Sequence, residues 1–146
     1  MPKRILVIDD VESVRRDIRN YINPPASARD QVALLMGRVT APPRIAFQID
    51  EAAQGEEGVE MVQAALDQGS PYDIVIVDMM MLPGINGVET IRRFRRFDKD
   101  AFVIICTGNG LMQMTEVVEA NLGIEPALLH KSGTQVAWLR FCDERT

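Results

Sequence analysis

Short apolar runs alternate along the chain with segments whose apolar residues recur every three or four positions. Runs of this length, apolar on both faces, are typical of strands in a covered parallel sheet. They occupy residues 3–10, 44–50, 72–78, 101–107 and 126–130. Helical spacing predicts helices in the intervening segments, at residues 11–22, 55–69, 88–97, 111–123 and 134–142. This alternation predicts an α/β fold in which right-handed crossovers place helices on both faces of the sheet.

One segment interrupts the alternation. Residues 23–43 lie between the first helix and the second strand, and a pair of prolines stands near each end. Within it an i, i+3, i+4, i+7 stripe predicts an additional amphipathic helix, formed by Val32, Leu35, Met36 and Val39. Two interpretations are open. The helix either packs as a lid on its own domain or exposes the stripe as a docking or dimerisation surface.

Composition narrows the class of protein. A length of 146 residues predicts one domain spanning 1–146, and a net charge of −5 argues against direct nucleic-acid binding. No apolar run approaches the roughly 18 residues that span a bilayer, and the N-terminus lacks the apolar stretch of a secretory signal. Cys106 and Cys142 form no metal or disulfide pattern. We therefore expect a cytoplasmic protein without membrane contact and, within this chain, no separate output domain.

The strand ends carry the candidate chemistry, because ligands of open α/β sheets bind beyond the carboxyl ends of the strands. The side chains there are Asp9, Asp10, Asp78, Thr107 and Lys131. Carboxylates about 5 Å apart repel by roughly 3 kcal/mol per pair at an effective dielectric of about 20. Mg²⁺ would relieve this repulsion, since it prefers a few carboxylates together with waters and phosphate oxygens. A lysine and a hydroxyl suit phosphoryl oxygens, so the set indicates phosphoryl transfer with a carboxylate nucleophile.

Five segments, in order, resemble the receiver domains of two-component response regulators. They are LVIDD (6–10), AAQGEEGVEMV (52–62), DIVIVDMMMLPGINGVE (73–89), VIICTG (103–108) and ANLG with HKSG (120–133). The resemblance covers the chain except for the 23–43 insertion. It implies the flavodoxin-like (βα)5 doubly wound sheet with strand order 2-1-3-4-5, an order already known for a receiver protein.

The resemblance also implies roles for the acids. Asp78 would be the phosphoacceptor and also a Mg²⁺ ligand, Asp10 a direct Mg²⁺ ligand and Asp9 its neighbour acting through water. The family uses the backbone carbonyl two residues past the phosphoacceptor as a further ligand, which here is that of Met80. The turn from Asp78 to Gly87 is one residue longer than the family's usual pattern.

The phosphoryl oxygens would be bound by Thr107, by Lys131 and by the backbone N–H of Gly108. Two nearby positions depart from the family pattern. Ser132 follows the lysine where the family usually has proline, and Leu128 stands where an aromatic side chain commonly acts as a switch. We therefore expect the signal to leave by another route.

We interpret the chain as a phosphoacceptor switch of a two-component phosphorelay. The donor would be a histidine kinase or histidine phosphotransfer protein, the cofactor Mg²⁺, and the output partner another protein or a second copy of the chain. Enzymatic activity is not expected beyond slow self-phosphorylation and self-dephosphorylation. One alternative is a degenerate receiver acting as a phosphate-independent interaction module. Another is an aspartyl phosphohydrolase, which would have an acid at position 80, where this chain has Met80.

Overall fold

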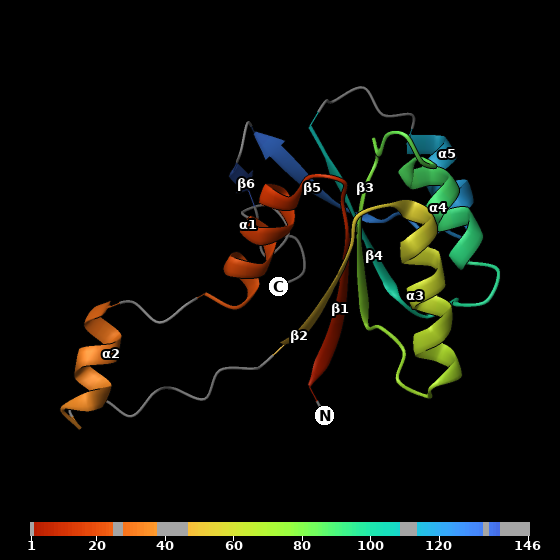
Figure 1. The fold of residues 1–146 in the computed structure, drawn as a ribbon. Coiled ribbons are helices and arrows are strands. Elements are labelled where there is room, and N and C mark those ends of the chain that lie inside the picture. Colours follow the sequence, from red (N-terminus) through yellow and green to blue (C-terminus); the bar gives the residue numbers. More distant parts are fainter. Residues whose placement is uncertain (1, 25–27, 38–46, 109–113, 133–134, 138–146) are drawn as a thin grey trace.

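The computed structural model describes residues 2–24, 28–37, 47–108, 114–132 and 135–137 (Figure 1). Their strands form one sheet in the order β2-β1-β3-β4-β5-β6. The strands are β1 (Lys3–Ile8), β2 (Phe47–Ala52), β3 (Ile74–Asp78), β4 (Phe102–Thr107), β5 (Ala127–Ser132) and β6 (Gln135–Ala137). The first five are parallel, which confirms the predicted order 2-1-3-4-5.

The sixth strand is a correction to the sequence-based prediction. A helix was predicted over 134–142, but Gln135–Ala137 forms β6 and pairs antiparallel with β5. Ser132 is opposite Gln135, so the two intervening residues match the commonest hairpin length. Pairing with the edge of β5 satisfies backbone groups that a short helix would leave unpaired. The remainder of that predicted helix, residues 138–142, lies outside the described residues.

Helices cover both faces of the sheet. They are α1 (Glu12–Ile22), α3 (Gly55–Asp67), α4 (Gly87–Phe94) and α5 (Met114–Ala120), with α2 (Ala28–Leu35) in the insertion. Figure 1 shows α1 on one face and α3, α4 and α5 on the other. None of the described helices is both long and apolar enough to cross a bilayer.

The core follows the period-two alternation of each strand. In β1, Leu6 and Ile8 point into the cluster with Val62, Ile91 and other residues of α3, α4 and α5. Their neighbours in β1 point to the opposite cluster, which contains Val14 and Ile18 of α1 together with Ile5, Val7 and Cys106. Burial on both faces explains why the strands read as continuous apolar runs.

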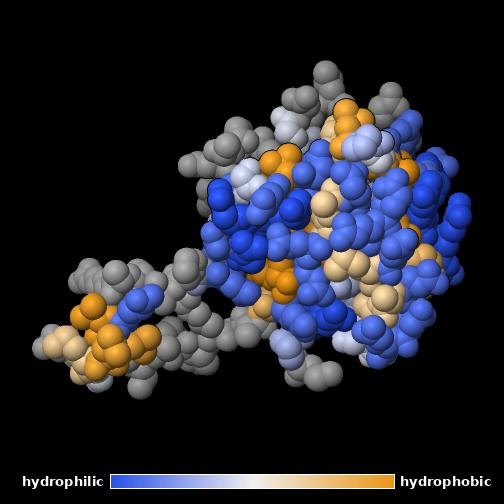
Figure 2. All heavy atoms as spheres, viewed as in Figure 1, coloured by the Kyte–Doolittle hydropathy of each residue, from blue (hydrophilic) through white to orange (hydrophobic). Residues whose placement is uncertain are grey.

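Helix α2 (Ala28–Leu35) lies within the insertion. It stands apart from the sheet in Figure 1, and Figure 2 shows apolar side chains gathered on it. Val32, Leu35 and Met36 of the predicted stripe are all exposed, Leu35 to 88%, while Val39 lies outside the described residues. The described part of the insertion therefore does not pack as a lid.

Candidate functional site

Three carboxylates meet where β1 and β3 end. Asp9 and Asp10 follow β1, and Asp78 is the last residue of β3. The two strands are parallel neighbours, with Ile8 opposite Val77. One carboxylate oxygen from each of the three acids lies within 4.8 Å of the others. The structure thus brings together the acids that the sequence placed at strand ends.

Backbone contacts orient the carboxylate of Asp9, which is buried. Its backbone N–H donates to the Ala52 carbonyl at 3.1 Å, and its Oδ1 accepts from the Val11 N–H at 2.9 Å. Arg15 donates to the Asp9 carbonyl at 2.5 Å. Asp9 is therefore tied to β2 and to the start of α1, whereas Asp10 is only half-buried.

The donor set fits a hard divalent cation. Carboxylate oxygens are the ligands that Mg²⁺ takes in proteins, and Asp9, Asp10 and Asp78 offer one each within a span suited to a shared ion. At 4.8 Å and an effective dielectric of about 20, each carboxylate pair repels by about 3 kcal/mol. An ion held by these three side chains would remove that repulsion.

The phosphoryl-binding candidates lie along the same edge of the sheet. Thr107 ends β4 and is buried; it lies one residue beyond Cys106, which is opposite Asp78. Gly108 follows it and is exposed. Lys131 belongs to β5, one residue past His130, which is opposite Thr107. The backbone register therefore places position 131 at this edge, and the lysine side chain lies outside the part of the chain that is described.

The two positions that depart from the family pattern, 128 and 132, both lie in β5. Ser132 lies in β5 and pairs with Gln135, and Leu128 is partly exposed, with 37% of its surface accessible. A leucine side chain at this position has neither a ring nor a polar group to exchange between buried and exposed states. Leu128 therefore cannot act as the aromatic switch that the family commonly has at this position.

The three methionines after Asp78 alternate between core and surface. Met79 and Met81 are buried, whereas the side chain of Met80 is 70% exposed. The Met79 N–H donates to the Cys106 carbonyl at 3.2 Å, and the Met79 carbonyl accepts from the Gly87 N–H at 3.1 Å. The Met80 N–H reaches Asp78 Oδ1 at 3.4 Å. The backbone of Met80 is therefore held beside the acid cluster.

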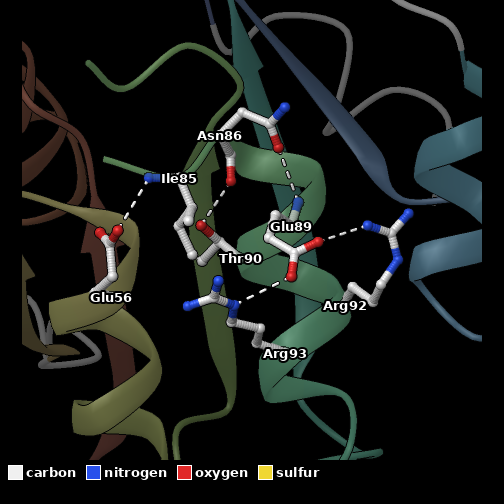
Figure 3. Close-up of polar contacts among 7 residues, drawn as sticks. All are labelled: Glu56, Ile85, Asn86, Glu89, Thr90, Arg92 and Arg93. Atoms are coloured by element: carbon white, nitrogen blue, oxygen red, sulfur yellow. Dashed lines mark hydrogen bonds and ion pairs between the residues drawn. The ribbon is translucent and has the colours of Figure 1, made fainter. Parts of the chain in front are cut away.

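Helix α4 begins with a network of side-chain contacts (Figure 3). The Asn86 side chain caps the helix by accepting from the Glu89 N–H at 2.9 Å. Hydrogen bonds from Arg92 and Arg93 hold the pKa of the Glu89 carboxyl below its ordinary value. Arg92 and Arg93, in the segment RRFRRF (92–97), thus pair within their own helix, which supports a structural role for these two side chains.

Sequence reasoning missed the role of Arg95. This side chain is buried and donates to Asn121 Oδ1 at 2.8 Å and to the Ala101 carbonyl at 2.6 Å. It joins the end of α4 to the end of α5 and to the loop before β4. Four arginines within six residues look alike in sequence, and only the placement of Asn121 singles out this one.

Comparison with known proteins agrees with this geometry. The profile of the response regulator receiver domain family matches residues 5–132. The transcriptional regulatory protein ResD of Bacillus subtilis is 30% identical over 107 residues, which are 73% of this chain and 33% of ResD. This chain therefore spans about a third of that relative. The chemotaxis protein CheY of Thermotoga maritima is 29% identical over 120 residues, 82% of this chain and 78% of that protein.

Solved structures show the same arrangement. Response regulator protein TrrA from Thermotoga maritima, in complex with Mg(2+)-BeF, is 26% identical and has a TM-score of 0.58, with 98% of this chain and 95% of that one covered. In its complex with the histidine kinase ThkA, TrrA has a TM-score of 0.61 at 25% identity, with 97% and 94% covered. Profile, relatives and sheet topology agree, and this chain belongs to the response regulator receiver domain family.

Proposed function

We propose that Asp78 is the phosphoacceptor of this receiver domain and that its phosphorylation requires Mg²⁺. Receiver domains of this family act as phosphoacceptor switches in two-component signalling. The observation that supports the assignment is the approach of Asp9, Asp10 and Asp78 to within 4.8 Å of one another at the end of β3. Asp78 is the acid of the three that terminates the central strand, β3, with neighbours on both sides.

In the proposed transfer, a carboxylate oxygen of Asp78 forms a bond to phosphorus as the phosphorus–nitrogen bond of a phosphohistidine breaks. Asp9, Asp10, Asp78 and the Met80 carbonyl would hold the ion, which would supply positive charge to the phosphoryl oxygens. Thr107 at the end of β4 and Gly108 after it would donate to those oxygens, through the hydroxyl and the backbone N–H.

The donor in this proposal is a histidine kinase or histidine phosphotransfer protein. The solved complex of TrrA with the histidine kinase ThkA supports that class of partner. The output partner is a protein or a second copy of the chain, and the exposed stripe of Val32, Leu35 and Met36 is the proposed contact surface. Turnover is limited in this proposal to slow self-phosphorylation and self-dephosphorylation. A cytoplasmic location stays a prediction.

The test is intact-mass spectrometry after incubation with acetyl phosphate and Mg²⁺. The wild type should gain one phosphoryl group, and Asp78→Asn should gain none. Asp73→Asn is the matched control, because Asp73 is an exposed acid immediately before the same strand. Absence of the gain in the wild type, with acetyl phosphate and with phosphorylated kinases alike, would favour the phosphate-independent interaction module instead.

A further inference from the structure

The loop that leaves Asp78 is attached to the start of α3. Glu56, in the first turn of α3, accepts a hydrogen bond from the Ile85 N–H through Oε1 at 3.1 Å (Figure 3). Gln54 is the N-cap residue of α3, yet its side chain does not cap the helix. Its Nε2 lies 3.5 Å from the Leu82 carbonyl. Two neighbouring side chains thus reach two backbone groups of the loop.

Glycine at position 84 is what permits this approach. A Cβ on Gly84 would lie 2.6 Å from Gln54 Oε1 and 2.6 Å from Glu56 Oε2. The same holds on the helix side, where a Cβ on Gly55 would lie 2.7 Å from Cγ1 of Ile85. Contacts below 3 Å require one partner to move. A Cβ at Gly84 would displace the ends of the Gln54 and Glu56 side chains, and a Cβ at Gly55 would press against Ile85 itself.

The contact between Glu56 and the loop lies in the exposed part of the loop. Met79 and Met81 are buried, but Leu82 is 74% exposed, and the chain returns to a buried position only at Gly87. Residues 82–86 therefore lie outside the buried core. Core packing cannot restrain such a segment, and the α3 side chains supply the restraint in its place.

Glutamate suits this position for two reasons. A carboxylate in the first turn of a helix interacts favourably with the helix dipole, and a charged acceptor forms a stronger hydrogen bond than a neutral one. The restraint acts close to the acid cluster, because the Met80 N–H lies 3.4 Å from Asp78 Oδ1 and Met80 is two residues before Leu82.

We propose that Glu56, assisted by Gln54, is a positioning residue for the Mg²⁺ site: it holds loop residues 82–85 against α3 and so presets the Met80 carbonyl. The inference rests on the proposed function, in which that carbonyl is a ligand. Without the restraint, the loop must be ordered when the ion binds, and the entropy lost in ordering it weakens binding.

The test is Mg²⁺ binding to the full chain, measured by titration calorimetry without any phosphodonor. Glu56→Ala should weaken Mg²⁺ binding about threefold to tenfold, the range expected for one intramolecular hydrogen bond. Glu56→Gln keeps an acceptor oxygen but loses the charge, and it should weaken binding less than Glu56→Ala does. Glu60→Ala, which removes an exposed charge one turn along α3, should leave binding unchanged. Hydrogen exchange of the Ile85 amide should be faster in Glu56→Ala than in the wild type.

Gly84→Ala approaches the same contact from the loop side, because its Cβ would displace the Glu56 carboxylate. It should weaken Mg²⁺ binding as much as Glu56→Ala does, and the double variant should bind no more weakly than either single one. Wild-type affinity in Glu56→Ala would overturn the inference and leave the proposed function standing. Equal weakening in Glu56→Gln would also overturn it, since charge would then be the cause. Phosphoryl gain from acetyl phosphate, measured by mass on the same proteins, tests the proposed function separately: no gain by the wild type would refute that function whatever the Mg²⁺ affinities are.

Discussion

Replacing Asp10 by asparagine should stabilise the metal-free protein and abolish its stabilisation by Mg²⁺. Asp10 has a carboxylate oxygen within 4.8 Å of oxygens of Asp9 and Asp78, so its charge takes part in two repulsive pairs. At an effective dielectric of about 20 each pair would cost about 3 kcal/mol. Asp10 is half-buried. With the water around it the effective dielectric rises to about 60, and the two pairs together then cost about 2 kcal/mol, or roughly 4–8 °C in Tm.

The assay is thermal unfolding with a chelator and then across a Mg²⁺ titration. The wild type should gain about 2.7 kcal/mol when Mg²⁺ reaches 100 times its Kd, whereas Asp10→Asn should gain much less. The order of stability of the two proteins should therefore reverse as Mg²⁺ is added. Glu125→Gln removes an exposed charge elsewhere and should leave both responses unchanged. The reasoning is refuted if Asp10→Asn is no more stable in chelator, or if Mg²⁺ stabilises both proteins equally.

Three further substitutions test other parts of the structure. Burial is the main cause, and the 2.6 Å hydrogen bond to Asp50 the second, of a Tyr72 pKa above its ordinary value. At high pH the folded protein therefore keeps the Tyr72 proton that the unfolded chain releases. Above about pH 10 the wild type should lose stability relative to Tyr72→Phe by about 1.4 kcal/mol per pH unit; urea midpoints from pH 8 to 11 that stay a constant distance apart would contradict this. Arg95→Met leaves Asn121 Oδ1 and the Ala101 carbonyl without their donor and should cost about 3 kcal/mol in urea unfolding; a loss below about 1 kcal/mol would argue against the bridge between α4 and α5. Leu35→Asp, at an 88% exposed position, should change the free energy of unfolding by less than about 0.5 kcal/mol, and a larger loss by the same assay would revive the lid interpretation.

Hydrophobic patterning alone was enough to predict the five parallel strands and the edge where the acids meet. Strands that alternate with helices and are apolar on both faces have few ways to fold. Once the strands are parallel, their carboxyl ends share one edge of the sheet. Asp9, Asp10 and Asp78 each end or follow a strand, so their meeting within 4.8 Å could be predicted without coordinates.

Other contacts could not be predicted in this way, because the residues that form them have no distinguishing pattern around them in the sequence. Gln135–Ala137 became a strand because β5 offered an open edge, and α2 left Leu35 exposed because no other described element packs against it. Arg95 and Glu56 are charged residues among many, yet one meets Asn121 and the other the Ile85 N–H. Hydrophobic periodicity specifies which face of an element is buried. It does not specify which polar groups will contact each other. Those contacts depend on the register and packing of segments that are distant in the sequence.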